Sequence, residues 1–502
     1  FDTNEEIEAK ARALAESMKN AKHCVVFTGA GVSTSAGIPD YRGPQGVWTL
    51  AAQGKSAQRT TELEKAVPTV THMALKELVD RGIVKHVISQ NVDGMHRKSG
   101  IAQNLSELHG NTNLEVCTIC GREYLRDYGV RVAQGTFEHR TGRFCCVPGC
   151  HGALKDSIVN FGENLPERSI NGGYTNSMRS DLHIVLGSSL TVSPANDMPR
   201  STAQNGGELV ICNLQRTPLD NLCSLRIYGP CDVLMTKVMV HLGLPIPSFA
   251  LHRRVVMSRS SRGPDVEEVR VAGVEVDGIP ASIFREVRFE GSHASTEPFK
   301  GRVRPGEACR AEVVFIGHYG EPPVTLTLPA GEERKGYLLA FHPLGDMQWT
   351  VEELSHVPIP DVGPTEGLDA APQEHFAEDL MDLSQWHAVT PLPDCPHTRF
   401  TNADQMKVNL LSPCAHPGCD NVGENMLCLA CHVVLCGRHV HGHSLAHHEE
   451  TRHPMVCGFV DLSFWCYECE SYVDSANRWL RPIYIAMHTA KFGEPPAGIP
   501  HT

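Results

Sequence analysis

CVVFTGAGVSTSAGIPDYRGPQGVW, residues 24–48, joins a short apolar run to a glycine-rich loop. The run, Cys24 to Phe27, has no helical period, which is typical of a buried strand in a parallel sheet. Gly29 and Gly31 allow a tight turn where a side chain would collide with a ligand. A small-residue loop between a strand and a helix commonly holds the pyrophosphate of a dinucleotide, because N–H groups and the helix dipole favour an anion. The stretch predicts a nucleotide-binding α/β domain.

The rest of the first 250 residues repeats this pattern of apolar strands that release polar motifs. Two helices and three buried strands are predicted, at residues 3–20, 71–81, 83–89, 182–186 and 209–213. Thr3 and Glu6 form a capping box at the start of the first helix. The strand before Gln90 delivers Asn91 and Asp93 at its carboxyl end, where ligands bind in such sheets. We therefore expect a Rossmann-like, doubly wound parallel sheet with its chemistry along one edge.

Several spaced motifs within residues 5–249 closely resemble the sirtuins, the NAD-dependent protein deacylases. They follow the family's order: GAGVSTSAGIPDYRG (29–43), SQNVDGMH (89–96), LSELHGN (105–111), IVNFGE (158–163), LGSSLTVSP (186–194) and ICNLQRTPLD (211–220). The elements GVWTL and NLQRTP are similar to the nuclear class IV branch. The resemblance implies a lysine deacylase (deacetylase) that consumes NAD and releases nicotinamide and O-acyl-ADP-ribose.

The resemblance also assigns a cofactor site. NAD is expected to contact Gly29, Ala30, Thr34, Asp40, Tyr41, Arg42, Trp48, Gln90, Gly187, Ser189, Asn213, Gln215 and the backbone at Cys231. Asn91 and Asp93, with Ile38, are expected to line the nicotinamide pocket. These residue types suit the ligand, because glycyl N–H groups bind phosphate and amide side chains bind ribose hydroxyls.

His109, in the LSELHGN motif, is the general base that the resemblance implies, and the pKa of imidazole permits proton transfer near neutral pH. In the implied reaction the acyl-lysine oxygen attacks the anomeric carbon of the nicotinamide ribose, nicotinamide leaves, and His109 activates a ribose hydroxyl. The substrate peptide is expected to add as a strand between IVNFGE and LGSSLTV. Val159 and Phe161 are the expected walls around the acyl-lysine stem.

A four-cysteine module interrupts the α/β pattern within an expected lobe at residues 112–160. Cys117-x2-Cys120 and Cys145-x4-Cys150 have the spacing of a structural zinc site with four thiolate ligands. Cys146 is an alternative to Cys145, which the resemblance favours because TGRFC matches the family's motif. Free core cysteines are the other interpretation. Since no ligand position is open, this zinc is expected to hold the lobe together.

The chain changes character after the expected deacylase domain, residues 1–250. Residues 251–263 are basic and rich in serine, which predicts a linker. Residues 264–354 alternate between apolar and polar side chains, which predicts an antiparallel β-sandwich of six to eight strands that acts as a spacer or docking module. Residues 355–393 are rich in proline and acid and predict a flexible linker.

Residues 394–502 closely resemble the α+β UBP-type zinc finger, which binds the free C-terminus of ubiquitin. The resemblance groups the ligands into three zinc sites: Cys395/His397/Cys466/Cys469, Cys414/Cys419/Cys436/His443 and Cys428/Cys431/His447/His453. Three zinc ions would replace much of the core that so short a domain lacks.

Four residues of this finger match the family's pocket for the ubiquitin tail: Arg438, Trp465, Tyr467 and Tyr472. An arginine pairs with a terminal carboxylate, and flat aromatic rings enclose a diglycine that has no side chains. His439 departs from the pattern, because the family usually has an aromatic residue such as tyrosine there.

Charge and cysteine content restrict the partners and the compartment. The formal charge of −13 argues against a general nucleic-acid binder and fits a basic partner such as a Lys-rich tail. The resemblance to sirtuins implies acyl-lysine proteins, histones among them, as partners. Nineteen cysteines in metal-binding pairs amid 27 histidines predict a reducing compartment, the nucleus or cytosol. No apolar run approaches the ~20 residues of a membrane span, and no signal peptide opens the chain.

Two other functions fit the same fold. The first is transfer of ADP-ribose to protein, and the second is a non-catalytic reader of ubiquitin or an NAD metabolite. The presence of Asn91, Asp93 and His109 favours deacylation over both. A ubiquitin protease is suggested by the finger alone, and the chain has no room for a separate protease domain.

Overall fold

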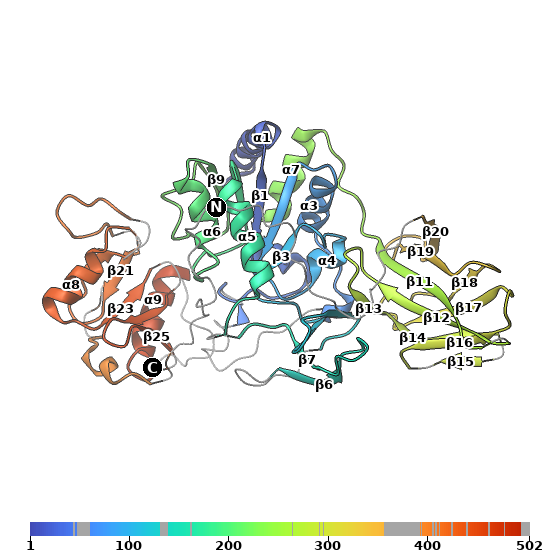
Figure 1. Ribbon diagram of the computed structural model, residues 1–502. Coiled ribbons are helices and arrows are strands. Elements are labelled where there is room, and N and C mark those ends of the chain that lie inside the picture. The colour runs from blue at the N-terminus through green and yellow to red at the C-terminus, as the bar shows by residue number, and fades with distance from the viewer. Residues whose placement is uncertain are drawn as a thin grey trace.

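The computed structural model describes residues 1–43, 46–47, 61–130, 139–160, 163–263, 265–290, 292–294, 296–355, 392, 394–403, 406, 409–410, 412–422, 425–437, 440–459, 462–475 and 477–492. Within them the chain forms an α/β domain with a small lobe, a β-sandwich, and a separate C-terminal finger (Figure 1). None of the described helices combines the length and the apolar character that crossing a membrane requires.

The α/β domain is built on a parallel sheet with strand order β10-β9-β8-β1-β2-β3. Its strands are β1 (Cys24–Thr28), β2 (Val84–Ser89), β3 (Leu105–Glu107), β8 (Leu182–Leu186), β9 (Glu208–Cys212) and β10 (Leu225–Ile227). Every residue of β1 is buried, as the unbroken apolar run predicts. The doubly wound α/β fold is confirmed.

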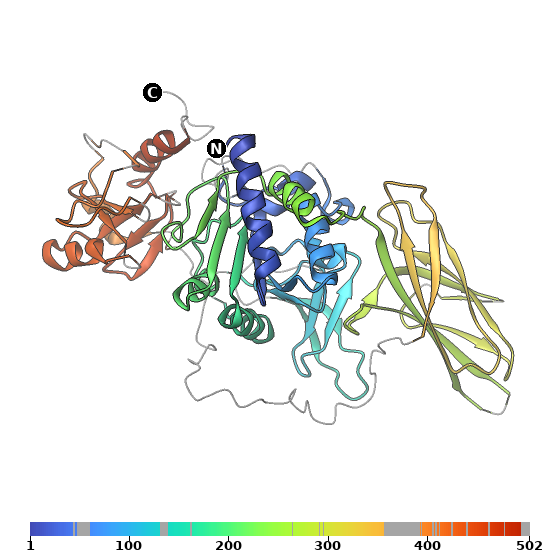
Figure 2. The same cartoon turned by 90° about the horizontal axis from the view of Figure 1, so that it is seen from above.

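Helices cover both faces of this sheet: α1 (Asn4–Asn20), α3 (Val70–Asp80) and α7 (Cys231–Leu242) on one side, and α5 (Glu167–Arg179) and α6 (Asp197–Gln204) on the other. Successive residues of β1 supply the two cores, since Val26 packs with the first group and Phe27 with the second. The capping box of Thr3 and Glu6 is present. Figure 2 shows α1 and α7 lying side by side.

The small lobe consists of β4 (Leu114–Cys117), β5 (Glu123–Arg126), β6 (Arg140–Phe144) and β7 (Ala153–Asp156). They form an antiparallel sheet in which β4 lies between β5 and β7. Tyr124 and Leu154 pack around the cysteines. The lobe has little apolar core of its own, so a bound metal would supply much of its stability.

The second unit is a sandwich of ten strands among the described residues: β11 (Leu251–Ser261), β12 (Glu267–Val274), β13 (Pro280–Ser282), β14 (Phe284–Phe289), β15 (Ser292–Ala294), β16 (Phe299–Val303), β17 (Cys309–Phe315), β18 (Val324–Leu328), β19 (Arg334–Phe341) and β20 (Trp349–Leu354). One face carries Val255 and Val271, and the other carries Val313 and Leu326, all in one core. The predicted sandwich is confirmed. The predicted count of six to eight strands is too low, because strands of three residues show no alternation.

The predicted linker at 251–263 is wrong. Residues Leu251–Ser261 form β11, the strand that pairs with both β12 and β19 in one sheet. Two of its basic side chains form ion pairs: Arg253 binds Asp127, and Arg259 binds Glu267. The predicted boundary at residue 264 is therefore displaced to about residue 251 in the structure.

The sandwich pairs with the small lobe through hydrogen-bonded strands, a contact that a simple spacer would not make. Strand β13 pairs in parallel with β5, with Ala281 opposite Leu125 and Ser282 opposite Arg126. This pairing merges one sandwich sheet with the sheet of the lobe. Asp127 strengthens the junction, because both of its carboxylate oxygens accept hydrogen bonds from Arg253 at 2.7 Å.

The finger contains β21 (Asn425–Cys428), β22 (Val434–Cys436), β23 (Met455–Gly458), β24 (Phe464–Cys466) and β25 (Ser471–Val473), with α8 (His443–Thr451) and α9 (Arg481–Phe492). The strand order is β22-β21-β23-β24-β25, and all of these pairs are antiparallel. The α+β class is confirmed. Nearly all of the acidic linker predicted at 355–393 lies outside the described residues.

Candidate active site and metal clusters

The glycine-rich loop meets the end of β8 so closely that no side chains fit between them. Gly29 N–H donates to the carbonyl of Leu186 at 3.0 Å, and Gly31 N–H donates to that of Gly187 at 2.9 Å. A Cβ at Gly29 or Gly31 would lie 2.7 Å from atoms of Gly187, whose φ of +63° also favours glycine. Glycine is therefore required here for the close approach of the loop to the end of β8, at the carboxyl edge of the sheet.

The loop after β2 is fixed to this glycine-rich loop by three buried polar side chains. Asn91 Nδ2 donates to the carbonyl of Gly29 at 3.1 Å and to Ser33 Oγ at 3.3 Å. Ser33 in turn donates to Asp93 Oδ2 at 2.6 Å. The structure thus brings together Asn91 and Asp93 with Ser33, which the sequence analysis missed because a serine in a turn carries no distinctive signal.

His109 lies beside this network. Its Nδ1 is 2.8 Å from the carbonyl oxygen of Gln90. Because a carbonyl oxygen only accepts, Nδ1 carries the proton and Nε2 is the acceptor nitrogen of the neutral ring. Burial, together with the Arg42 cation, lowers the pKa of His109 below its ordinary value of 6.5. The ring is therefore a neutral proton acceptor at physiological pH.

Two further contacts define the rim. Ser188 donates to Gln90 Oε1 at 2.7 Å, so Gln90 is held by both its side chain and its backbone. The backbone N–H of Val159 donates to the carbonyl of His109 at 3.1 Å, which places the IVNFGE segment next to the base. Ser188 is a second residue that the sequence analysis missed, since Ser189 beside it is the residue of the family's motif.

The remaining predicted cofactor residues lie around the same edge. Ala30, Tyr41 and Arg42 are half-buried, and Thr34 is exposed. Burial raises the pKa of Asp40, whose Oδ1 accepts the N–H of Gly43 at 2.9 Å. Ser189, Asn213 and Gln215 follow β8 and β9, and Cys231 begins α7. Ile38 packs against Met95 near Asp93. The predicted Trp48 and Phe161 lie outside the described residues.

The four cysteines of the small lobe converge. Sulfur atoms of Cys117 and Cys150, and of Cys120 and Cys145, are each 3.6 Å apart, with all four within 4.8 Å. A zinc–sulfur distance of about 2.3 Å places tetrahedral sulfurs about 3.8 Å apart, so the group fits zinc. Cys146 is exposed and lies outside the group. The choice of Cys145 over Cys146 agrees with this geometry.

The twelve predicted ligands of the finger form three further groups of four, each with its ligand atoms within 4.8 Å: Cys395/His397/Cys466/Cys469, Cys414/Cys419/Cys436/His443 and Cys428/Cys431/His447/His453. These mixed sulfur and imidazole sets are the ligands of structural zinc. None of the nineteen cysteines forms a disulfide, so no disulfide competes with metal binding.

Two aromatic residues of the predicted ubiquitin pocket share one face of the finger sheet. Trp465 in β24 is paired directly with Tyr472 in β25, and their ring centroids are 5.0 Å apart. Tyr467 stacks on His448 and donates to Ser444 at 3.0 Å. The predicted Arg438 and the divergent His439 lie outside the described residues.

Two protein-family models match this chain, one in its N-terminal half and one in its C-terminal finger. The Sir2 family model matches residues 52–194, and the model of the zinc finger in ubiquitin hydrolases and other proteins matches residues 414–478. The NAD-dependent protein deacetylase SRT1 of Arabidopsis thaliana is 44% identical over 64% of this chain and 70% of its own length. Because residues 1–250 are about half of the chain, this match continues beyond the α/β domain.

Two other matches are confined to about half of the chain. The human NAD-dependent protein deacetylase sirtuin-7 is 43% identical over 50% of this chain and 64% of its own length. A solved structure of Sir2 with a p53 peptide and NAD+ is 32% identical, covers 46% of this chain and 98% of its own, and has a TM-score of 0.37. The chain therefore belongs to the Sir2 family, the NAD-dependent protein deacetylases, and carries a UBP-type zinc finger in its C-terminal part.

Proposed function

We propose that this chain removes acyl groups from protein lysine side chains, with His109 as general base, and releases nicotinamide and O-acyl-ADP-ribose. The observation that carries the proposal is the Nδ1–H bond from His109 to Gln90, beside the linked side chains of Asn91 and Asp93. Bound NAD supplies the ribose carbon that accepts the acyl oxygen and the hydroxyl that later takes the acyl group.

Each group of residues in the site has its own proposed role. The glycine-rich loop is proposed to lie beside the pyrophosphate, and Asn91 and Asp93 are proposed to orient the nicotinamide amide. His109 accepts a ribose proton at Nε2, because its Nδ1 proton is committed to Gln90. Backbone pairing beside Val159 holds the acyl-lysine peptide as an added strand, which gives affinity with little sequence preference.

An assay of nicotinamide release tests this function. Purified chain and NAD should release nicotinamide when an acetylated peptide is added, with the unmodified peptide as the control. Comparison with long-acyl peptides then ranks the acyl groups. Equal release with both acetylated and unmodified peptides would show simple NAD hydrolysis and contradict the proposal.

The same assay across pH reports on His109. The base must be neutral, and its pKa lies below 6.5. Activity should therefore fall as pH decreases through the lowered pKa, because protonation then removes the acceptor at Nε2, and should be constant at neutral pH. A rate that still rises steeply with pH above neutral would place the catalytic pKa elsewhere.

Zinc in both lobes is structural in this proposal. Each group has four sulfur or imidazole ligands, which completes a tetrahedron and leaves no position for substrate. We expect elemental analysis of the purified chain to give four zinc ions. Replacement of Cys428 by serine should lower the count to three and lower the melting temperature of the finger, whereas Cys146→Ser should leave the count at four. One zinc or none would contradict the assignment.

The finger is proposed to bind ubiquitin that is not conjugated. A terminal carboxylate exists only on free ubiquitin or unanchored chains, because conjugation converts it to an amide. Trp465 and Tyr472 offer flat surfaces on adjacent strands, and Arg438 would supply the matching cation.

Acyl-lysine proteins such as histones are the proposed substrates. We propose a reducing compartment, the nucleus or cytosol, because twelve cysteines lie in metal-binding groups.

A further inference from the structure

The short helix α4 (Met95–Ser99) directly follows the loop that carries Asn91 and Asp93, and it holds the end of that loop in place. Asp93 Oδ1 accepts the backbone N–H of Met95 at 3.0 Å, while its Oδ2 accepts the hydroxyl of Ser33. Gly94 between them has a φ of +70°, so the chain turns sharply from the loop into the helix. A displacement of α4 would therefore displace Asp93 and its hydrogen-bond partners.

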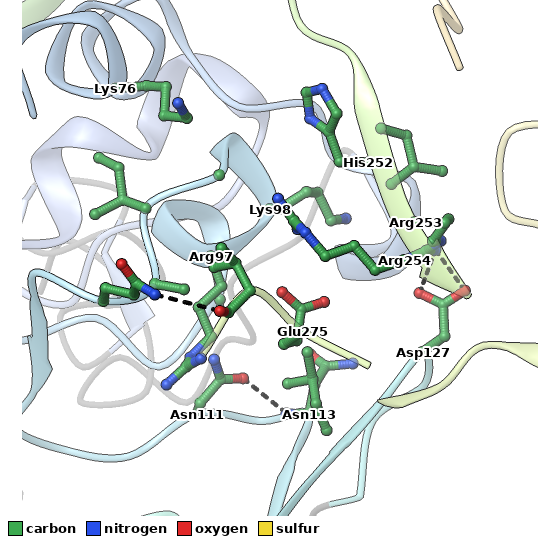
Figure 3. Close-up of a pocket in the computed structure, with 18 of the residues that line it drawn as sticks. Lys76, Arg97, Lys98, Asn111, Asn113, Asp127, His252, Arg253, Arg254 and Glu275 are labelled. Atoms are coloured by element: carbon green, nitrogen blue, oxygen red, sulfur yellow. Dashed lines mark hydrogen bonds and ion pairs between the residues drawn. The ribbon is translucent and has the colours of Figure 1, made fainter. Parts of the chain in front are cut away.

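One side of α4 faces a cavity instead of a packed core. The cavity has a volume of about 380 Å³ and lies between the α/β domain and the sandwich. Figure 3 shows Arg97 and Lys98 on one side of it and Arg253, Arg254 and Glu275 of the sandwich on the other. Close packing cannot fix the helix on this side, so specific polar contacts must do so.

Arg97 makes the strongest of these contacts, because it binds two carboxylates at once. Its Nε donates to Glu107 at 2.8 Å, and one terminal nitrogen donates to Asp277 at 3.0 Å. The Arg97 side chain is 11% exposed and each carboxylate 8%, so water screens these bonds weakly. Asp277 belongs to the turn between β12 and β13 of the sandwich.

Glu107 connects this ion pair to the base. It lies two residues before His109, and its Oε1 accepts a hydrogen bond from Asn111 Nδ2 at 2.7 Å. The segment that carries His109 is thus held on both sides by Glu107 and Asn111. Through Arg97, the sandwich contacts both halves of the proposed site: the loop that ends at Asp93 and the segment around His109.

A second contact from the sandwich reaches the neighbouring lysine. Lys98 Nζ donates to the hydroxyl of Tyr319 at 3.1 Å and to the carbonyl oxygen of Glu64 at 2.9 Å. Tyr319 donates to the carbonyl of Ala66 at 2.8 Å. Tyr319 therefore completes a polar cluster that fixes α4 to the segment before α3.

We propose that Asp277 is a positioning residue for the deacylation reaction, acting through Arg97 on the Asp93 loop and the His109 segment. The sandwich then helps to position the catalytic groups of the α/β domain. This inference rests on the proposed function. It gives the sandwich a role in the reaction. That role explains why the turn between β12 and β13 places the buried carboxylate of Asp277 against Arg97 of the α/β domain.

The test replaces Asp277 in the full chain by asparagine, which has the same shape but no charge. We expect Asp277→Asn to lower kcat roughly tenfold to a hundredfold, as for small displacements of reacting groups, with little change in the KM of the acyl peptide. Asp277→Glu should restore most of kcat, since it keeps the charge, and its partner Arg97 lines a cavity that gives the guanidinium room to shift by one methylene. Tyr319→Phe should lower kcat less, again without raising KM.

Asp127→Asn is the matched control. It breaks a second ion pair of the same junction, with Arg253, and among the described residues neither partner makes a hydrogen bond or an ion pair to α4. Its melting temperature should fall about as much as that of Asp277→Asn, while its kcat stays at the wild-type value. The inference is overturned if Asp277→Asn keeps wild-type kcat, if both variants lose kcat equally, or if Asp277→Glu fails to restore it. An inactive wild-type chain would instead refute the proposed function itself.

Discussion

Replacement of His109 by alanine should abolish NAD-dependent deacylation while the fold and the zinc content stay unchanged. The alanine removes the Nε2 acceptor. Among the described side chains, Ser188 also hydrogen-bonds to Gln90, but its hydroxyl is not a base that could replace the imidazole. Loss of a general base typically lowers a rate by ~10² to 10⁴. The measurement is single-turnover release of deacetylated peptide.

His23→Ala is the matched control for this experiment. His23 is also half-buried and bonded, to Asn176 at 3.0 Å, but it precedes β1 and so lies at the opposite edge of the sheet. Its activity should match that of the wild type. Wild-type turnover by the His109 variant would remove His109 from the mechanism.

Removal of the last two glycines of ubiquitin should eliminate its binding to the finger. In the proposed mode of binding, the last glycine carries the terminal carboxylate, and both glycines lie against the aromatic rings of Trp465, Tyr467 and Tyr472. Truncation of a charge-pairing arginine at a partly desolvated site costs on the order of 2 kcal/mol, about thirtyfold in affinity, so Arg438→Ala should approach the same loss. His439→Tyr should tighten binding by restoring an aromatic ring. Calorimetric titration of the full chain measures all of these.

Arg478→Ala supplies the control, because Arg478 is an exposed arginine of the same finger that stacks on Trp479. It should leave the affinity unchanged. Equal affinity for intact and truncated ubiquitin would refute the pocket. Absence of binding to either would make the finger a purely structural zinc domain.

The parts of the fold that local patterns encode were predictable from the sequence. Strand β8 was predicted at its observed bounds because its buried residues form a continuous apolar run. The metal groups were predictable because ligand spacing is a local property, as in Cys117-x2-Cys120. The choice between Cys145 and Cys146 was harder, since it depends on where a tight turn directs two adjacent side chains.

Contacts between distant segments were not predictable. The basic, serine-rich composition of β11 predicts a linker, whereas Arg253 is paired with Asp127, which lies far back in the chain. The pairing of β13 with β5 could not be predicted either, since strands of three and four residues have no periodic signal. The contacts that position the site, Arg97 with Asp277 and Ser33 with Asp93, depend on topology.

Mass spectrometry of the products of one reaction tests the central claim most directly. The full chain, NAD and a peptide with an isotope-labelled acetyl-lysine should yield free lysine, nicotinamide and O-acetyl-ADP-ribose in equal amounts, with the label on the ADP-ribose. Label that stays on the peptide while ADP-ribose becomes attached to protein would contradict deacylation and identify the chain as an ADP-ribosyltransferase.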